Sequence, residues 1–387
     1  MRVLFLYPTI YPDFIGGVEH RNYELAAALV RRGHEVTLAG LCNRPLADAP
    51  HLTVLALGKL GDIYNTKGRR STRQALRFAA LVPRLDLRPY DVVETANIPY
   101  IHLVPLAAKC ALTKKPLLVT WYEYWGPYWK RYLSPLRAPA YRIVEWLTAQ
   151  LGTSVTATSE LTRERLAKNR LRGGVDLVPC GIHVATVREA AAGGTRGSGP
   201  PLVYAGRLLE EKRIDLLLRA VALLAPRRPG RLLTVFGEGP YRERLEALTA
   251  ELGLLDRVAF CGHVADNVEV WRELGRARVA VQPSEREGFG LFPLEAMAAG
   301  LPVVYCTSSE SAVPELVRHG VEGVECRPVP EELAEALGRL LDDSEDWERL
   351  SRNARERAAL YDWDEIARRI EERLTATASR ESPKNGV

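Results

Sequence analysis

Short apolar runs alternate with amphipathic stretches along most of this 387-residue chain. The first residues read MRVLFLY, GVEHRNYELAAALVRRG and HEVTLAG in turn, which is the pattern of a strand, a helix and a second strand. Strands that are apolar on both faces are typical of a parallel sheet covered by helices. The opening of the chain therefore predicts an α/β fold.

The alternation continues in two series. Each apolar run is followed by a segment with helical periodicity, and the runs occupy residues 91–95, 116–121, 154–159 and 175–180, then 201–206, 232–237, 257–262, 279–284 and 302–306. Helical patterns return after residue 329. Two doubly wound α/β units, each with its own parallel sheet, account for this order most simply.

A boundary between the two units is predicted at VREAAAGGTRGSGPP, residues 187–201, which is rich in Gly, Ala, Ser and Pro and has no hydrophobic period. That composition is typical of a flexible linker. We expect an N-terminal domain over 1–186, a linker over 187–200 and a C-terminal domain over 201–361. A helix over 362–378 should complete the first domain, and the polar tail that follows should be disordered.

The net charge of +5 is distributed unevenly. Residues 1–184 hold 25 Lys and Arg against 14 Asp and Glu, so 28 and 34 remain for the rest of the chain. A basic N-terminal half favours an anionic partner for that half. The positive charge comes without a nucleic-acid-binding motif, so no nucleic acid is expected as a partner.

Composition excludes several other classes of protein. With 47% hydrophobic and 26% charged residues, the chain is neither disordered nor fibrous. No stretch approaches the ~20 apolar residues that cross a bilayer, and the opening run lacks the features of a signal peptide, so we expect a cytoplasmic protein. The six cysteines form no CxxC pair, so we expect neither disulfides nor a cysteine zinc site.

Ligands of an open parallel sheet bind beyond the carboxyl ends of its strands, and helices that begin after glycine turns favour anions there. Gly16 and Gly17 follow the first strand. They would let backbone N–H groups approach a phosphate, or they serve only as a loop. The chain contains no GxGxxG at this place, which disfavours a nicotinamide dinucleotide site.

A pair of basic residues follows the first strand of the second series, in AGRLLEEKRIDLLLRA. Arg207 and Lys212 would form a clamp for a diphosphate, or they are solvated charges at the start of a helix. The glycines of the nearby FGEGPYRERL serve a turn. Backbone groups of CGHV, residues 261–264, are in a position to meet the edge of a base.

Two carboxylates flank a glycine turn in EREGFGLFPLEAMAAGLPVV, residues 285–304. Glu287 is predicted to stand in the loop after a strand, and Glu295 about one turn into the next helix, facing the same mouth. Both could accept hydrogen bonds from vicinal hydroxyls, while the amides of 288–290 donate to a phosphate. The alternative is a pair of ordinary solvated charges.

These segments together resemble a known family. GGVE, GRLLEEK, FGEGPYRERL and above all PSEREGFGLFPLEAMAAGLPVV resemble the retaining GT-B glycosyltransferases of the GT4 family (glycosyl transferases group 1), over nearly the whole chain. The resemblance implies two Rossmann-like domains facing a central cleft, the first on the acceptor side and the second for the donor. It also implies transfer of a hexose-type sugar from a UDP or GDP sugar to a hydroxyl of a lipid-linked, glycan or small-molecule acceptor. No metal ion or other cofactor is implied.

The resemblance also implies roles for single residues. Arg207 and Lys212 would hold the diphosphate and stabilise it as the leaving group, and Glu287 would contact the sugar hydroxyls as the third catalytic residue. Glu295 would accept hydrogen bonds from the ribose. Further donor contacts would come from Gly16, Gly17, Gly206, Val264 or its neighbour His263, Gly288, Phe289, Gly290 and Leu291.

The chain departs from the family pattern at the acceptor side. Many relatives carry a histidine after the strand PLLVT, but this chain reads TWYEYWGPYW, so Tyr122 and Glu123 are expected to position the sugar or the acceptor. His102 lies elsewhere, and the usual NGVD corner is replaced by CGIHV, residues 180–184. A nucleotide-sugar epimerase, a phosphorylase-like enzyme and a non-catalytic nucleotide-sugar-binding protein stay as alternatives.

Two basic segments of the first domain are suited to bind an anionic acceptor or an anionic membrane surface. Residues 121–147 are aromatic and basic, and residues 67–88 form a second basic amphipathic stretch. Such segments can rest on an anionic membrane or hold an anionic acceptor, which would make the protein peripheral at the inner membrane face. The alternative is an aromatic helix that faces the core and has a solvated basic face.

Overall fold

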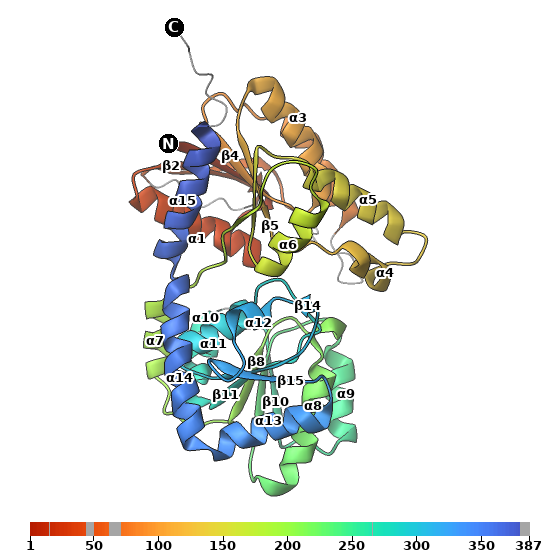
Figure 1. Ribbon diagram of the computed structural model, residues 1–387, viewed down its shortest axis with the longest axis vertical. Helices are drawn as coiled ribbons and strands as arrows, with labels where there is room; N and C mark the ends of the chain where they lie inside the picture. The colour runs from red at the N-terminus through yellow and green to blue at the C-terminus, as the bar shows by residue number, and fades with distance from the viewer. Residues whose placement is uncertain (15, 44–49, 62–70, 265, 380–387) are drawn as a thin grey trace. The chain divides into compact units, whose positions relative to one another are not determined.

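A computed structural model of the protein describes residues 1–14, 16–43, 50–61, 71–264 and 266–379. The chain divides into two compact units, Met1–Cys180 together with the segment from Trp363 onward, and Gly181–Asp362 (Figure 1). The predicted disordered tail, from 380 on, and the beginning of the basic stretch 67–88, up to 70, lie outside the described residues.

The first unit is built on a seven-stranded parallel sheet of order β3-β2-β1-β4-β5-β6-β7. The central strand β1 pairs on both sides, so that Val3 lies opposite Val36 on β2 and Val92 on β4. Its strands are β1 (Arg2–Thr9), β2 (Glu35–Leu41), β3 (Leu52–Gly58), β4 (Val92–Ala96), β5 (Leu117–Trp121), β6 (Ser154–Ala157) and β7 (Asp176–Leu177).

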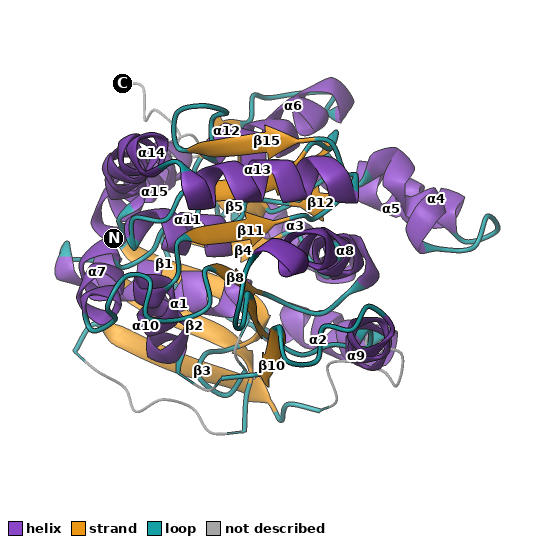
Figure 2. Cartoon of the chain, turned by 90° about the horizontal axis from the view of Figure 1, so that it is seen from below, coloured by secondary structure: helices purple, strands orange, loops and turns teal. Residues whose placement is uncertain are grey.

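Helices cover both faces of this sheet because alternate residues of its strands point to opposite sides. Val3 and Phe5 pack with α1 and with the C-terminal helix α15, which lies along α1, whereas Leu4 and Leu6 pack with α2 and α3 on the other face (Figures 1 and 2). The helices are α1 (Gly17–Arg31), α2 (Thr72–Leu81), α3 (Leu103–Thr113), α4 (Trp129–Tyr132), α5 (Ala138–Ala149), α6 (Glu160–Asn169) and α15 (Trp363–Ser379).

The second unit is built on a six-stranded parallel sheet of order β10-β9-β8-β11-β13-β15, with a separate pair β12-β14 beside it. Its strands are β8 (Leu202–Ala205), β9 (Leu233–Phe236), β10 (Val258–Gly262), β11 (Val279–Gln282), β12 (Arg286–Glu287), β13 (Val303–Cys306), β14 (Glu310–Ser311) and β15 (Gly323–Cys326). Its helices are α7 (Val184–Ala192), α8 (Ile214–Leu224), α9 (Arg242–Glu251), α10 (Asn267–Arg276), α11 (Leu291–Ala298), α12 (Val313–Leu316), α13 (Pro330–Asp342) and α14 (Ser344–Ala358).

Short 3₁₀ helices occur in both units. They are η1 (Val82–Arg84), η2 (Tyr100–His102), η3 (Gly126–Tyr128), η4 (Glu210–Lys212), η5 (Ala225–Arg227) and η6 (Ala359–Tyr361). The two parallel α/β sheets confirm the fold class that the alternation of apolar runs predicts.

The prediction of a flexible linker over 187–200 is wrong for its first part. Residues Val184–Ala192 form helix α7, which buries Val184, Val187 and Ala191 and packs against α10. Those three positions lie on one helical face, and the alanines between them favour a helix. The two helices approach so closely that a Cβ at Gly275 would clash with the backbone of Ala191. The boundary between the units lies earlier, after Cys180.

Two features of the structure concern cysteine chemistry and membrane-spanning helices, which the composition also addresses. All six cysteines are free thiols; Cys306 and Cys326 lie on neighbouring strands with their sulfur atoms 3.9 Å apart, and Cys261 is exposed rather than packed in a core. Across the described ranges, no helix combines the length and the apolar character that crossing a membrane requires.

Candidate functional site

The carboxyl ends of β8 and β11, which are neighbours in the second sheet, carry the residues that the sequence singles out. Gly206 ends β8 with a φ of +157°, and a Cβ there would lie 2.7 Å from the Tyr204 hydroxyl. A Cβ at Gly237 would clash with the backbone of Gly206. These glycines let the loops after β8 and β9 approach each other closely. Arg207, the residue after Gly206, is exposed at this edge of the sheet.

An ion pair joins the loop after β8 to the loop after β11. Lys212 Nζ donates to Glu287 Oε2 at 2.6 Å, and both side chains are mostly buried, with 17% and 19% of their areas exposed. Gln282 Nε2 donates to the same oxygen at 2.8 Å and to Ser284 Oγ at 2.8 Å. The carboxylate is therefore fixed by a cation and an amide, while the Lys212 ammonium keeps further protons for another acceptor.

A second ion pair holds the same loops together. Arg286 lies 3.4 Å from the Glu211 carboxylate, and the backbone N–H of Glu285 donates to the Glu211 carbonyl at 2.9 Å. Sequence reasoning missed Glu211, Arg286 and the Gln282 amide. Only Gln282 left a signal, as a polar residue at the end of an otherwise apolar buried strand.

Helix α11 begins at this edge with its amino end free of a side-chain cap. Its N-cap residue is Gly290, whose φ of +103° lies in the left-handed region that glycine adopts readily. The first N–H groups of a helix have no partner within the helix and carry the positive end of its dipole. The start of α11 is thus suited to an anion. Glu287 stands in the segment that leads into this helix, and Lys212 of η4 pairs with it.

Glu295 lies in the second turn of α11, on the side of Trp271 of helix α10. Burial raises the pKa of the Glu295 carboxyl to about 7, and the Trp271 indole opposes this shift by hydrogen bonding. The two acids of the segment therefore differ: Glu287 has a cationic partner, whereas Glu295 sits in an environment that favours its neutral form.

The remaining predicted donor residues of the second unit are half-buried around this turn. Gly288, Phe289 and Leu291 surround the start of α11, and the Phe289 ring lies 5.9 Å from that of Tyr361. Val264 packs on the edge of the core of the unit, after β10. Within the described residues, no group of three or more His, Cys, Asp or Glu side chains is arranged to hold a metal ion.

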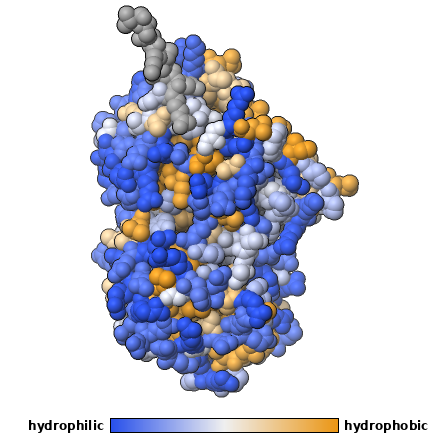
Figure 3. Space-filling model, viewed as in Figure 1, coloured by the Kyte–Doolittle hydropathy of each residue, from blue (hydrophilic) through white to orange (hydrophobic). Residues whose placement is uncertain are grey.

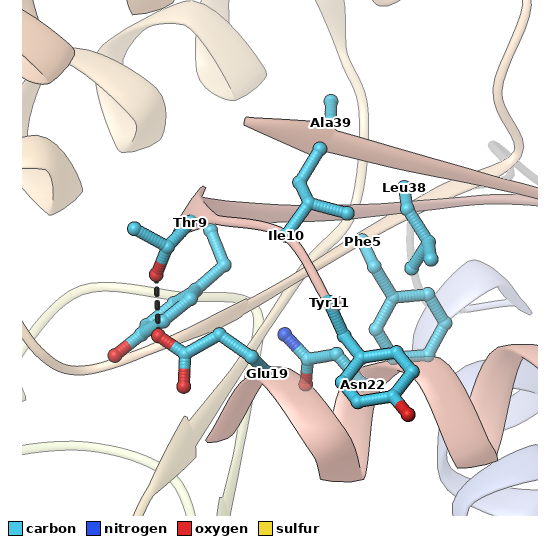
Figure 4. Close-up of a pocket in the computed structure, with 9 residues that line it drawn as sticks. Phe5, Thr9, Ile10, Tyr11, Glu19, Asn22, Leu38 and Ala39 are labelled. Atoms are coloured by element: carbon cyan, nitrogen blue, oxygen red, sulfur yellow. Dashed lines mark hydrogen bonds between the residues drawn. The ribbon is translucent and has the colours of Figure 1, made fainter. Parts of the chain in front are cut away.

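Gly16 and Gly17 lie at the amino end of α1 in the first unit, as the sequence predicts, but a carboxylate lies beside them. Glu19 is buried, accepts a hydrogen bond from the Thr9 hydroxyl, and would clash with a Cβ at Gly16. Thr9, Glu19 and Asn22 line a small pocket there (Figure 4). An anion that approached Gly16 would meet the charge of Glu19, which the sequence argument did not consider.

Tyr122 follows β5 and turns its hydroxyl into the first unit. The hydroxyl is buried, and the guanidinium carbon of Arg21 lies 5.7 Å from the centre of the Tyr122 ring. Arg21, itself 1% exposed, donates to Glu94 Oε1 at 3.4 Å, and the Thr120 hydroxyl donates to the same oxygen at 2.6 Å. Burial raises the pKa of Glu94 while Arg21 opposes the shift. Tyr122 is thus held by a buried polar cluster.

Glu123, the second predicted acceptor-side residue, has local partners, and so has His102. Glu123 accepts a hydrogen bond from the Trp125 indole at 2.5 Å, and its backbone carbonyl accepts one from Asn97. His102 lies in η2, fully buried, with Nε2 2.9 Å from the Thr95 hydroxyl. The histidine therefore belongs to the interior of the first unit.

Comparison with known families covers both units. Residues 15–186 match Glycosyltransferase Family 4, and residues 189–357 match Glycosyl transferases group 1. The chain belongs to the GT4-type glycosyltransferases. This glycosyltransferase is 28% identical over 397 residues to a glycogen synthase of Mycobacterium tuberculosis, which covers 95% of this chain and 92% of that protein.

Solved structures agree with the GT-B fold of the glycosyltransferase. A sucrose-phosphate synthase from Thermosynechococcus elongatus superposes with a TM-score of 0.80 at 22% identity, over 98% of this chain and 99% of the other. The Anabaena protein HepE in complex with UDP-glucose superposes with a TM-score of 0.74 at 20% identity, over 97% of this chain and all of that one.

Proposed function

We propose that this glycosyltransferase moves a hexose-type sugar from a nucleotide-diphosphate sugar to a hydroxyl acceptor, with retention of the anomeric configuration. The observation that carries the proposal is the Lys212–Glu287 pair, 2.6 Å between Nζ and Oε2, which joins η4 to the segment that leads into the uncapped start of α11. A fixed cation and the amides of a helix start suit a diphosphate, and a fixed carboxylate suits sugar hydroxyls.

In the proposed reaction, the bond between the anomeric carbon and the diphosphate oxygen breaks as the acceptor hydroxyl oxygen bonds to that carbon on the same face, which retains the configuration. The hydroxyl proton passes to the departing diphosphate. Negative charge grows on the departing diphosphate, and positive charge grows on the sugar ring. In this proposal Lys212, Arg207 and the first amides of α11 stabilise the first of these charges. Preorganised groups of this kind favour the transition state over the ground state. Glu287 accepts hydrogen bonds from the sugar hydroxyls and holds the ring beside them.

The nucleotide is the part of the proposal that is easiest to test. The HepE structure contains UDP-glucose, which makes UDP the first candidate and GDP the second. A ligand that binds only the native state stabilises it by about 2.7 kcal/mol at a hundred times its dissociation constant. In a thermal-shift panel of UDP, GDP, ADP and their sugars, one nucleotide should raise the melting temperature well above the others. No shift with any of them would contradict the proposal.

Glu295 predicts a pH dependence of donor binding. If its carboxylate accepts hydrogen bonds from the ribose, it must be ionised, and the pKa of its carboxyl is about 7. The affinity for UDP-glucose should therefore rise with pH through about 7 and level off above about 8, by up to tenfold per pH unit on the acidic side. Isothermal titration over this range measures it.

Glu295→Gln is the matched variant because it keeps the shape and removes the titration. Its affinity should be lower at pH 8 and independent of pH. The stability of the free protein gives a second check. The pKa of the Glu295 carboxyl is near 4.5 in the unfolded state and about 7 in the native state, so between these two pH values the native state binds more protons than the unfolded state. The contribution of Glu295 to the free energy of unfolding therefore falls as the pH rises. Equal pH profiles for the wild type and Glu295→Gln would rule out the ribose role.

A further inference from the structure

Helix α5 in the first unit has its apolar face turned outward. Its buried residues are Ala138, Glu145, Thr148 and Ala149. With 3.6 residues per turn, the side opposite Glu145 carries Pro139, Ala140, Ile143, Val144, Trp146 and Leu147, all of them exposed. An amphipathic helix in a soluble domain has the reverse arrangement. The alternative for residues 121–147, aromatic side chains that face the core, holds for Trp121, Tyr124 and Trp129 but not for α5.

The orientation of α5 is fixed by Glu145, which is fully buried. Its carboxylate accepts hydrogen bonds from the Trp125 and Gly126 backbone N–H groups at 2.8 and 2.7 Å, and from the Tyr100 hydroxyl and the Trp129 indole, each at 3.0 Å. Rotating α5 to bury its apolar side would break four hydrogen bonds to a buried carboxylate. The hydrogen bonds of Glu145 thus keep the apolar face of α5 turned outward, because leaving a buried charge unpaired is costly.

The exposed apolar side chains on α5 and just before it are large. Ile143 is 59% exposed, Leu147 51% and Trp146 37%, and Leu136, in the loop before α5, is 92% exposed. Figures 1 and 2 both show α4 and α5 standing out from the sheet of the first unit. Figure 3 shows orange, hydrophobic side chains beside blue, hydrophilic ones on the part of this unit that carries α5.

Within residues 126–150 the exposed charges have one sign. Between residues 126 and 150 the basic residues Lys130, Arg131, Arg137 and Arg142 are all exposed, and the one acid is the buried Glu145. Exposed apolar side chains with a basic rim suit a surface that is negative at the headgroups and apolar beneath them. A second copy of the same chain would bring a second set of four basic residues against the first.

We propose that the face formed by Leu136, Ile143, Val144, Trp146 and Leu147, with its basic rim, docks the protein on an anionic lipid bilayer. The apolar side chains enter the boundary between headgroups and acyl chains, while the rim contacts the anionic headgroups. This inference goes beyond the proposed transfer reaction and does not rest on it, because it concerns binding to a surface and not the donor.

Vesicle flotation of the full-length protein tests the proposal. The wild type should float with vesicles of 70% phosphatidylcholine and 30% phosphatidylglycerol, and only weakly with phosphatidylcholine alone. Ile143→Ser with Leu147→Ser should lower the partition coefficient at least about tenfold. Arg137→Glu with Arg142→Glu should lower it on anionic vesicles and leave the weak binding to neutral vesicles unchanged.

The matched control is Leu223→Ser with Leu255→Ser, which removes two exposed leucines of the second unit, 49% and 69% exposed. This variant should float as the wild type does. Failure of the wild type to float, or equal flotation of the Ile143/Leu147 variant, would overturn the proposal. So would a wild-type dimer in light scattering that the Ile143/Leu147 variant converts to monomer, because the face would then join two copies of the chain.

Discussion

Replacing Glu287 with alanine should lower the kcat of sugar transfer about a hundredfold or more. A hydrogen bond to a charged group contributes about 1.5–3 kcal/mol, and the proposal gives this carboxylate two sugar hydroxyls. Each 1.36 kcal/mol is a factor of ten in rate. The variant also frees Lys212, whose ammonium is now held 2.6 Å from the carboxylate. Steady-state transfer assays with the nucleotide sugar chosen by the thermal-shift panel measure the effect.

Two further variants make this result specific. Glu287→Gln keeps the side-chain shape and should retain part of the activity, because an amide oxygen still accepts hydrogen bonds. Glu335→Gln removes an exposed acid of α13 and should leave kcat unchanged. UDP should still raise the melting temperature of Glu287→Ala, since the nucleotide is held by other residues. Wild-type turnover by Glu287→Ala would exclude the carboxylate from the reaction.

Lys212→Ala should lower kcat by about 10²–10³-fold and also weaken UDP binding. The range is that for removing one preorganised group that stabilises developing negative charge. Lys212 serves the diphosphate in both ground and transition states, so binding and turnover should both fall, whereas Glu287→Ala should act mainly on turnover. Calorimetric titration with UDP, beside transfer kinetics, separates the two effects.

The control for Lys212 is Lys168→Ala, which removes a lysine that is 75% exposed on α6. It should change neither binding nor kcat. Lys212→Arg keeps the charge but replaces a compact ammonium with a larger, planar guanidinium. This variant should recover UDP binding better than it recovers activity. If Lys212→Ala bound UDP and turned over as the wild type does, the diphosphate would have to be held elsewhere.

Most of the fold could be predicted from the sequence because buried parallel strands are continuous apolar runs. Strands β5 and β11 are buried along their whole length and β1 at every position after Arg2, and the apolar runs predict all three. Strand β3 was not found: it lies at the edge of its sheet, and its residues are mostly half-buried or exposed. The pattern predicts a linker where the second part of α7 lies, because its alanines and the two glycines after it hide a helical period that only Val184 and Val187 mark.

The place of the candidate site could be predicted, but its contacts could not. Parallel strands end at one edge of their sheet, so the loops after the strands are the predicted place of the site. The Lys212–Glu287 pair joins residues 75 positions apart, and it depends on β8 lying next to β11, which no local pattern specifies. Likewise, nothing in the sequence shows that Glu145 is buried in α5, because its carboxylate is buried with four partners from other segments.

The most direct test of the proposed reaction is the anomeric configuration of its first product. Proton NMR of the sugar newly transferred from an α-linked donor, recorded before the anomers equilibrate, should show the α configuration. A β product would contradict retention. Conversion of the donor into an isomeric nucleotide sugar without an acceptor would indicate an epimerase, and tight binding with no turnover across an acceptor panel would indicate a nucleotide-sugar-binding protein.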